Sequence, residues 1–170
     1  MRFVAAMILF SACTMCGFLN AYRLGARSRG IHAVIADAKR IQSRMEYSSA
    51  SIGRILSETD ASEMHALWSC MSDELGHGST VFEGWRTAYE RTRTDLTILN
   101  ALHKEEIDAM DEFFRDLGTS DINSERKHFA LFYDRMEALY LTAESDYKNR
   151  GRVFRSIGTL GGAALAILVI

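Results

Sequence analysis

YKNRGRVFRSIGTLGGAALAILVI, residues 147–170, is the stretch that decides the predicted fold. Its first half is basic and leads directly into an apolar, glycine-rich tail. Lys and Arg remain on the cytosolic side of a membrane, where they lie beside anionic lipid. We therefore expect a helix that leaves a cytosolic domain and enters a membrane. The basic residues of this stretch are Lys148, Arg150, Arg152 and Arg155.

The apolar tail is short for a membrane span. Residues 157–170 form about 21 Å of helix, whereas the hydrocarbon core is about 30 Å thick. A transmembrane helix over residues 153–170 is long enough, provided that the one arginine in it extends to the headgroups. Gly158, Gly162 and Ala166 recur every four residues, a spacing that favours close packing against another helix. We predict that these three residues contact a second membrane helix.

A second apolar segment, residues 3–22, contains no charged residue. As a helix it is about 30 Å long, enough to cross the hydrocarbon core. More basic residues follow it than precede it, so the N-terminus is expected outside the cell and the rest of the chain inside. Gly17, Ala21 and Gly25 also recur every four residues, and they are the expected partner of the C-terminal glycines.

Charge is strongly segregated along the chain, although the net charge is only −2. Residues 46–146 contain 21 acidic and 9 basic residues, a balance of −12, whereas the rest of the chain contains 11 basic residues and Asp37 as its one acid. A nucleic-acid-binding protein concentrates basic residues on its folded domain, so the pattern disfavours that class. The acidic excess indicates either a solvated face or a docking surface for a basic partner.

Apolar residues repeat at three and four positions through the middle of the chain, which predicts amphipathic helices. The chain has no proline to break them. Capping boxes are expected at Asp60 with Glu63 and at Thr80 with Glu83, and Gly76 is an expected left-handed cap. The expected helices cover residues 31–56, 64–75, 81–89, 104–117 and a last helix from about 122, which Ser120 or Asp121 caps.

These patterns predict an all-α protein, an antiparallel bundle of about five to six helices between two transmembrane helices. Its predicted domains are an N-terminal transmembrane helix with its flank (1–25), a cytosolic bundle (26–152) and a C-terminal transmembrane helix (153–170).

Two Glu-x-x-His pairs raise the alternative of a metal-binding bundle, because di-iron carboxylate proteins contain such pairs. The pairs are Glu74 with His77, and Glu125 with His128. The first is expected in a loop and the second in the first turn of a helix, with both histidines at the surface. We therefore predict no metal, no cofactor, no catalytic residue and no small-molecule substrate.

The C-terminal run LY…AE…YK…RVFRSIG…GG, residues 139–162, closely resembles the end of the stage III sporulation protein AB family. Other residues typical of the family occur in the family's order earlier in the chain. They supply the candidate site residues Tyr47, Trp85 and, in the LGTSD turn, Leu117, Gly118 and Asp121. One departure is the absence of a proline shortly after Tyr47, where Ala50 and Ser51 stand. The long helix 31–56 is therefore expected to continue through this point.

The resemblance implies a non-enzymatic membrane subunit of the channel complex that links mother cell and forespore during endospore formation. It also implies a soluble domain similar to the type II secretion F platform protein. The implied partners are the ATPase of the complex and its other membrane subunits, and the implied location is the mother-cell membrane. A membrane-anchored adaptor unrelated to sporulation remains the second alternative.

Overall fold

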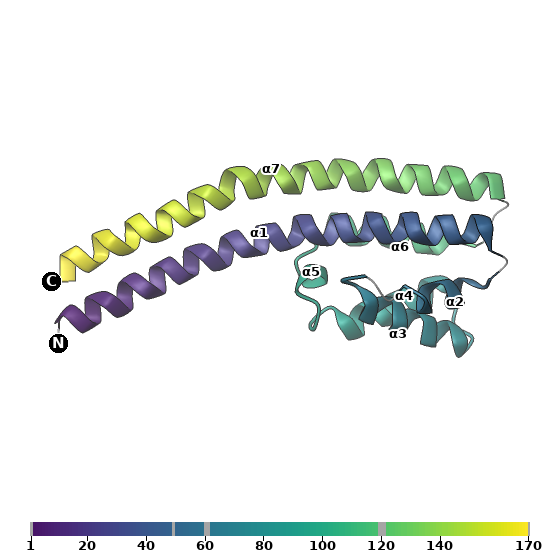
Figure 1. Ribbon diagram of the computed structural model, residues 1–170, viewed down its shortest axis with the longest axis horizontal. Helices are drawn as coiled ribbons and strands as arrows, with labels where there is room; N and C mark the ends of the chain where they lie inside the picture. The colour runs from purple at the N-terminus through teal and green to yellow at the C-terminus, as the bar shows by residue number, and fades with distance from the viewer. Residues whose placement is uncertain (1, 49, 60–61, 119–121, 170) are drawn as a thin grey trace. The chain divides into compact units, whose positions relative to one another are not determined.

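The computed structural model describes residues 2–48, 50–59, 62–118 and 122–169, which form seven α-helices and no strand (Figure 1). The all-α prediction is confirmed. The helices are α1 (Arg2–Tyr47), α2 (Ile52–Ser57), α3 (His65–Gly76), α4 (Val81–Thr92), α5 (Thr97–Asn100), α6 (Lys104–Asp116) and α7 (Ile122–Val169).

The chain divides into two compact units, and the two long helices each contribute to both. Unit 1 consists of Met1–Ser28 and Leu141–Ile170, which are the first part of α1 and the second part of α7. Unit 2 is Arg29–Tyr140 and contains α2 to α6 with the remainders of α1 and α7. The predicted domain boundaries at residues 25 and 152 refer to a membrane and remain predictions.

Helix α6 is the centre of unit 2, because two neighbouring aromatic residues on it face different helices. Phe113 stacks on Phe132 of α7, with ring centroids 4.3 Å apart. Phe114 stacks on Trp85 of α4 at 4.9 Å and also meets Trp68 of α3 at 6.1 Å. Such aromatic pairs contribute about 0.5–1.5 kcal/mol each beyond the apolar area that they bury. Helix α6 thereby joins α7 on one side to α3 and α4 on the other.

A buried carboxylate connects α1 to the segment that begins α3. Asp37 is only 1% exposed, yet its oxygens accept hydrogen bonds from Trp68 Nε1 at 2.7 Å, from Arg40 at 2.9 Å and from the Ser62 hydroxyl. A buried charge is tolerated when its lone pairs are satisfied in this way. Asp37 therefore selects one arrangement of α3 against α1.

The prediction of one continuous helix over residues 31–56 is wrong. Helix α1 ends at Tyr47 and α2 begins at Ile52, although the connection contains no proline. The Ser48 hydroxyl accepts the Ala50 N–H at 3.1 Å, and Ser51 is extended with ψ of 151°. A serine side chain that bonds nearby backbone in this way competes with the helix. The break allows Ile55 and Leu56 to be buried in unit 2.

The turn signals were predicted with mixed success. The Thr80–Glu83 capping box and the end of α6 before Gly118, which has φ of +82°, are confirmed. The prediction that Gly76 adopts the left-handed conformation is wrong, because the positive φ of +93° belongs to Gly78. Helix α3 begins at His65, later than a cap at Asp60 would place it. Asp60 itself lies outside the described residues, and so do Ser120 and Asp121, the caps expected for the last helix.

We predict that Asp37→Ala lowers the free energy of unfolding by about 3 kcal/mol, because it leaves the buried Trp68 N–H without its charged acceptor. The measurement is guanidinium unfolding of the full chain in detergent micelles, followed by tryptophan fluorescence, since both tryptophans lie in unit 2. Asp134→Ala removes an exposed carboxylate and is the control, with a change within about 0.5 kcal/mol. Equal effects of the two variants would contradict the structural role of Asp37.

Candidate interaction sites

Some of the predicted family residues lie at the end of unit 2 where α1 ends and α7 begins (Figure 1). Tyr47, the last residue of α1, is 87% exposed, whereas Leu117 is buried. Gly118 has the positive φ that its turn requires, and its N–H donates to Glu125 Oε1 at 2.8 Å. Asp121 lies outside the described residues.

Trp85 lies apart from this end, in the core of unit 2. It is fully buried, and its indole Nε1 donates to Asp111 Oδ1 at 2.7 Å. Arg86 pairs with the same carboxylate at 3.0 Å. These contacts give Trp85 a structural role in joining α4 to α6.

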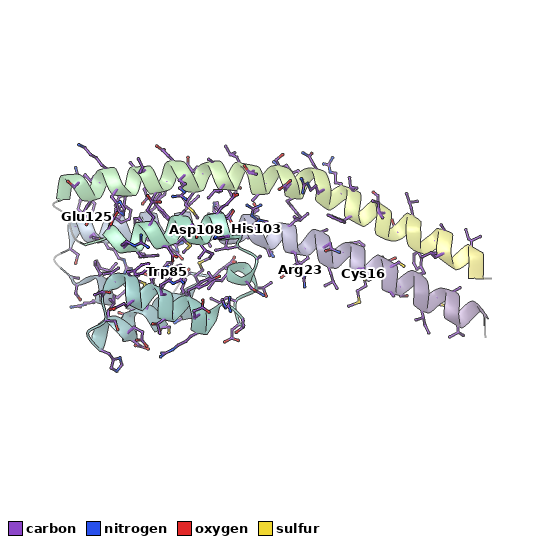
Figure 2. All side chains as sticks on the ribbon, turned by 180° about the vertical axis from the view of Figure 1, so that it is seen from behind. Cys16, Arg23, Trp85, His103, Asp108 and Glu125 are labelled. Carbon is purple, nitrogen blue, oxygen red and sulfur yellow. The ribbon has the colours of Figure 1, made fainter. Side chains whose placement is uncertain are left out.

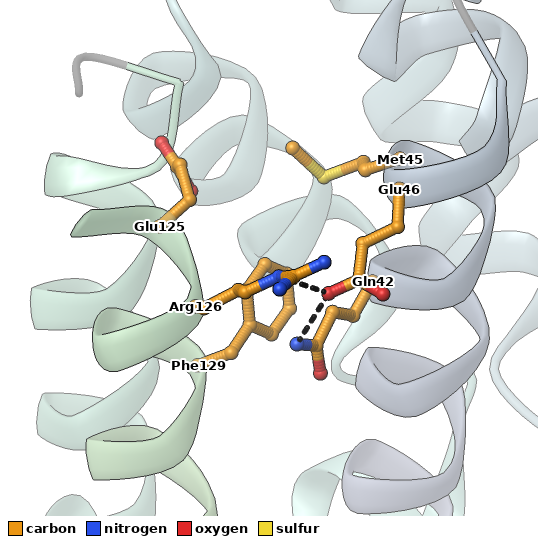
Figure 3. Close-up of a pocket in the computed structure, with 6 residues that line it drawn as sticks. All are labelled: Gln42, Met45, Glu46, Glu125, Arg126 and Phe129. Carbon is orange, nitrogen blue, oxygen red and sulfur yellow. Dashed lines mark hydrogen bonds and ion pairs between the residues drawn. The ribbon is translucent and has the colours of Figure 1, made fainter. Parts of the chain in front are cut away.

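A cavity of about 110 Å³ lies beside the turn, between the last part of α1 and the first part of α7 (Figure 3). Arg126 Nε donates to Glu46 Oε1 at 3.0 Å, and the Gln42 amide lies 3.4 Å from the same oxygen. Glu46 and Arg126 are 80 positions apart in the sequence, so no local pattern indicates that they pair. The cavity is lined by Gln42, Met45, Glu46, Glu125, Arg126 and Phe129.

A tyrosine orders the polar residues of this cavity through Gln42. The Tyr133 hydroxyl donates to Gln42 Oε1 at 2.9 Å, which directs the amide nitrogen of Gln42 towards Glu46. Burial raises the pKa of Tyr133 well above its usual range, and the negative charge of Glu46 raises it further. The phenol therefore remains a neutral donor at physiological pH.

A second candidate site is the close contact of α1 with α7 inside unit 1. A Cβ added at Gly17 meets the Phe154 carbonyl oxygen at 2.6 Å and Gly158 Cα at 3.0 Å. A Cβ added at Gly162 meets Cys13 Cβ and Phe10 at 3.2 Å. Only glycine permits such an approach of two helix backbones.

The structure thus places Gly158 and Gly162 against α1, one helical turn apart. The location of this contact in a membrane remains a prediction. Of the expected partner face, Gly17 meets Gly158, Ala21 is 1% exposed, and Gly25 faces the Tyr147 ring. The side chain of Ala166 lies outside the described residues.

The two Glu-x-x-His pairs make other contacts. Glu74 pairs with Arg91 at 2.7 Å, and His77 Nδ1 lies 2.7 Å from the Asp73 carbonyl oxygen. His128 is half-buried rather than at the surface as predicted, because its ring stacks on Phe113 at 5.1 Å. In the described part of the chain, no three His, Cys, Asp or Glu side chains gather where they could hold a metal.

A sequence model of the stage III sporulation protein AB family matches residues 2–170. The chain belongs to this family. The stage III sporulation protein AB of Bacillus subtilis (strain 168) is 25% identical over 173 residues, which cover 100% of this chain and 99% of that protein. A solved structure of a stage III sporulation protein AB has a TM-score of 0.58 and 22% identity, covering 72% of this chain and 96% of its own. This likeness supports the helical fold of the chain.

Within the described residues, α1 is the helix whose length and apolar composition suit a membrane crossing, with a mean hydropathy of 1.3 in its most apolar window. Length and composition also admit other kinds of helix near an N-terminus, so this observation indicates membrane association only weakly. The C-terminal transmembrane helix and the topology of the chain remain predictions.

We predict that Tyr133→Phe makes unit 2 less sensitive to alkaline pH. The raised pKa means that the neutral phenol stabilises the folded state fully below its unfolded pKa of about 10, and that this stabilisation is lost as the pH rises above that value. Guanidinium unfolding at about pH 8 and about pH 11 should show a smaller loss for the variant than for the wild type. Tyr47→Phe, at an exposed position, is the control and keeps the wild-type loss.

The glycine contact can be tested with the native Cys13. We predict that Gly162→Cys, in a Cys16→Ser and Cys70→Ser background, forms a disulfide with Cys13 on oxidation. A Cβ at residue 162 lies 3.2 Å from Cys13 Cβ, so a small outward shift brings the pair to the disulfide separation of about 3.5–4.5 Å. Adding Gly158→Leu should lower the disulfide yield, since the new side chain meets Gly17 and the Cys13 carbonyl oxygen. The yield is measured by counting free thiols with a maleimide-polymer gel shift.

Gly161→Leu is the matched control, because a Cβ at Gly161 meets nothing within 4 Å. It should leave the disulfide yield unchanged. If both leucine variants give the parent yield, the glycine contact does not determine how the two helices pack.

Proposed function

We propose that this protein is a non-enzymatic platform subunit in a membrane complex of endospore formation. The match to the stage III sporulation protein AB family over residues 2–170 is the observation that carries the proposal, and it supports a role in sporulation. It does not favour the alternative of an adaptor unrelated to sporulation. In the described residues, neither Glu-x-x-His pair belongs to a group of three His, Cys, Asp or Glu side chains that could hold a metal, so no observation supports the metal-binding alternative.

The complex is proposed to be the channel that links mother cell and forespore, with the subunit in the mother-cell membrane. Unit 1 would be its membrane part, with the N-terminus outside. Three features support this: the apolar composition of α1, the exposure of large apolar side chains on both helices of unit 1, and the basic residues that follow the apolar segment. The exposed apolar side chains include Met7, Ile8, Phe18, Ile157 and Leu160.

Unit 2 is proposed to couple a cytosolic secretion-type ATPase to the membrane channel. Its support is the balance of −12 over residues 46–146, which favours the approach of a basic surface. The two units share α1 and α7 as uninterrupted helices, so a load on unit 2 has a covalent, helical route to unit 1.

We predict that the full chain in detergent micelles binds the ATPase of its sporulation complex with a micromolar dissociation constant that rises with salt, because exposed charges are screened beyond a Debye length of about 8 Å at physiological ionic strength. Surface plasmon resonance at two salt concentrations measures both properties. Absence of binding at tens of micromolar would contradict the coupling role and leave a scaffold role.

A further inference from the structure

We propose that the cavity between α1 and α7 in unit 2 receives a basic side chain, arginine or lysine, from a protein partner. The inference rests on the proposed function for the identity of that partner, and on the geometry of the cavity for its chemistry. Four features of the cavity support this assignment: an unpaired carboxylate oxygen, a net negative charge, apolar lining residues and a volume that suits one side chain.

Glu125 contributes the unpaired oxygen. Its Oε1 accepts the Gly118 N–H at 2.8 Å, whereas its Oε2 is buried and has no hydrogen-bond partner in the described structure. Leaving a buried acceptor without a donor is unfavourable, and the cost is larger for a charged group. A guanidinium or ammonium group supplies the donor and the compensating charge together.

The polar wall remains negative after its internal pairs are counted. Glu46 and Glu125 carry two negative charges and Arg126 carries one positive charge. The Arg126 and Gln42 donors both point to Oε1 of Glu46, in an arrangement that the Tyr133 hydroxyl holds in place. One added cation therefore neutralises the wall without displacing an existing pair.

The apolar lining residues and the volume favour a side chain over a free metabolite. Met45 and Phe129 offer apolar contact to the methylene stem of arginine or lysine, and an aromatic face also attracts a cation. The volume of about 110 Å³ is well below the roughly 300–1,000 Å³ of pockets that enclose whole small ligands. Tyr47, next to Glu46 in the sequence and 87% exposed, offers a partner an aromatic contact near the cavity.

The test uses the full chain in detergent micelles with methionine methyl groups labelled with carbon-13, and N-acetyl-arginine amide as the probe. The Met45 methyl resonance should shift and saturate at millimolar probe, while Met15, in unit 1, does not shift. N-acetyl-citrulline amide has the same shape without the charge and should produce no saturable shift. An unmoved Met45 resonance, or an equal response to citrulline, would overturn the proposal.

Glu125→Gln is the decisive variant, because its amide oxygen still accepts the Gly118 N–H while the charge is removed. We predict that it raises the dissociation constant of the arginine probe at least about tenfold. Asp108→Asn removes one exposed charge from α6, away from the cavity lining, and is the matched control with unchanged affinity (Figure 2). Equal weakening in both variants would show a general charge effect and overturn the site.

The two proposals fail in distinguishable ways. ATPase binding that persists at wild-type strength in Glu125→Gln, together with an unmoved Met45 resonance, overturns the cavity and leaves the platform function. An arginine probe that binds the wild type and not Glu125→Gln supports the cavity even where the ATPase does not bind, and the platform function then fails alone.

Discussion

Unit 2 depends on the aromatic contacts that α6 makes in two directions. Phe113 packs on Phe132 of α7, and Phe114 packs on Trp85 of α4 and Trp68 of α3. Through one aromatic residue towards each side, this short helix joins α7 to α3 and α4. Because protein interiors are packed densely, a shift of α6 would disturb its packing against α7 and against α3 and α4 together. Phe129, which lines the cavity between α1 and α7, also packs on Phe113, with ring centroids 5.0 Å apart.

Buried carboxylates give this packing its specificity. Asp37 and Glu106 are almost completely buried, and each has a named donor: Trp68 Nε1 for Asp37, and the His103 N–H for Glu106 at 2.6 Å. Burying a charge adds little net stability, but an arrangement that leaves it unpaired is strongly disfavoured. Glu125 differs from these two, because one of its oxygens is buried with no hydrogen-bond partner in the described residues. This difference is the physical reason for proposing that Glu125 binds a basic side chain of a partner.

Prediction from the sequence succeeded where the controlling interactions are local. The stripe of α6 and the Thr80–Glu83 capping box depend on residues three or four positions apart, and both agree with the structure. The end of α1 was missed because its signal, the Ser48 hydroxyl bonded to the Ala50 N–H, is no stronger in the sequence than at many exposed serines. The candidate site residues also differ in where they lie. Gly118 lies in the turn before α7, whereas Trp85 belongs to the core of unit 2.

The sequence by itself determined the helical class, the family and the segregation of charge, because periodicity, motif order and composition are properties of the chain read in one dimension. It also indicated that Gly158 and Gly162 would face a helix, since a four-residue spacing places them on one side. Only the tertiary structure decided that Gly17 is the residue opposite Gly158, and that Glu46, Glu125 and Arg126 line one cavity. These pairings join positions about 80 or more residues apart, and the register between two helices depends on their whole packed surface.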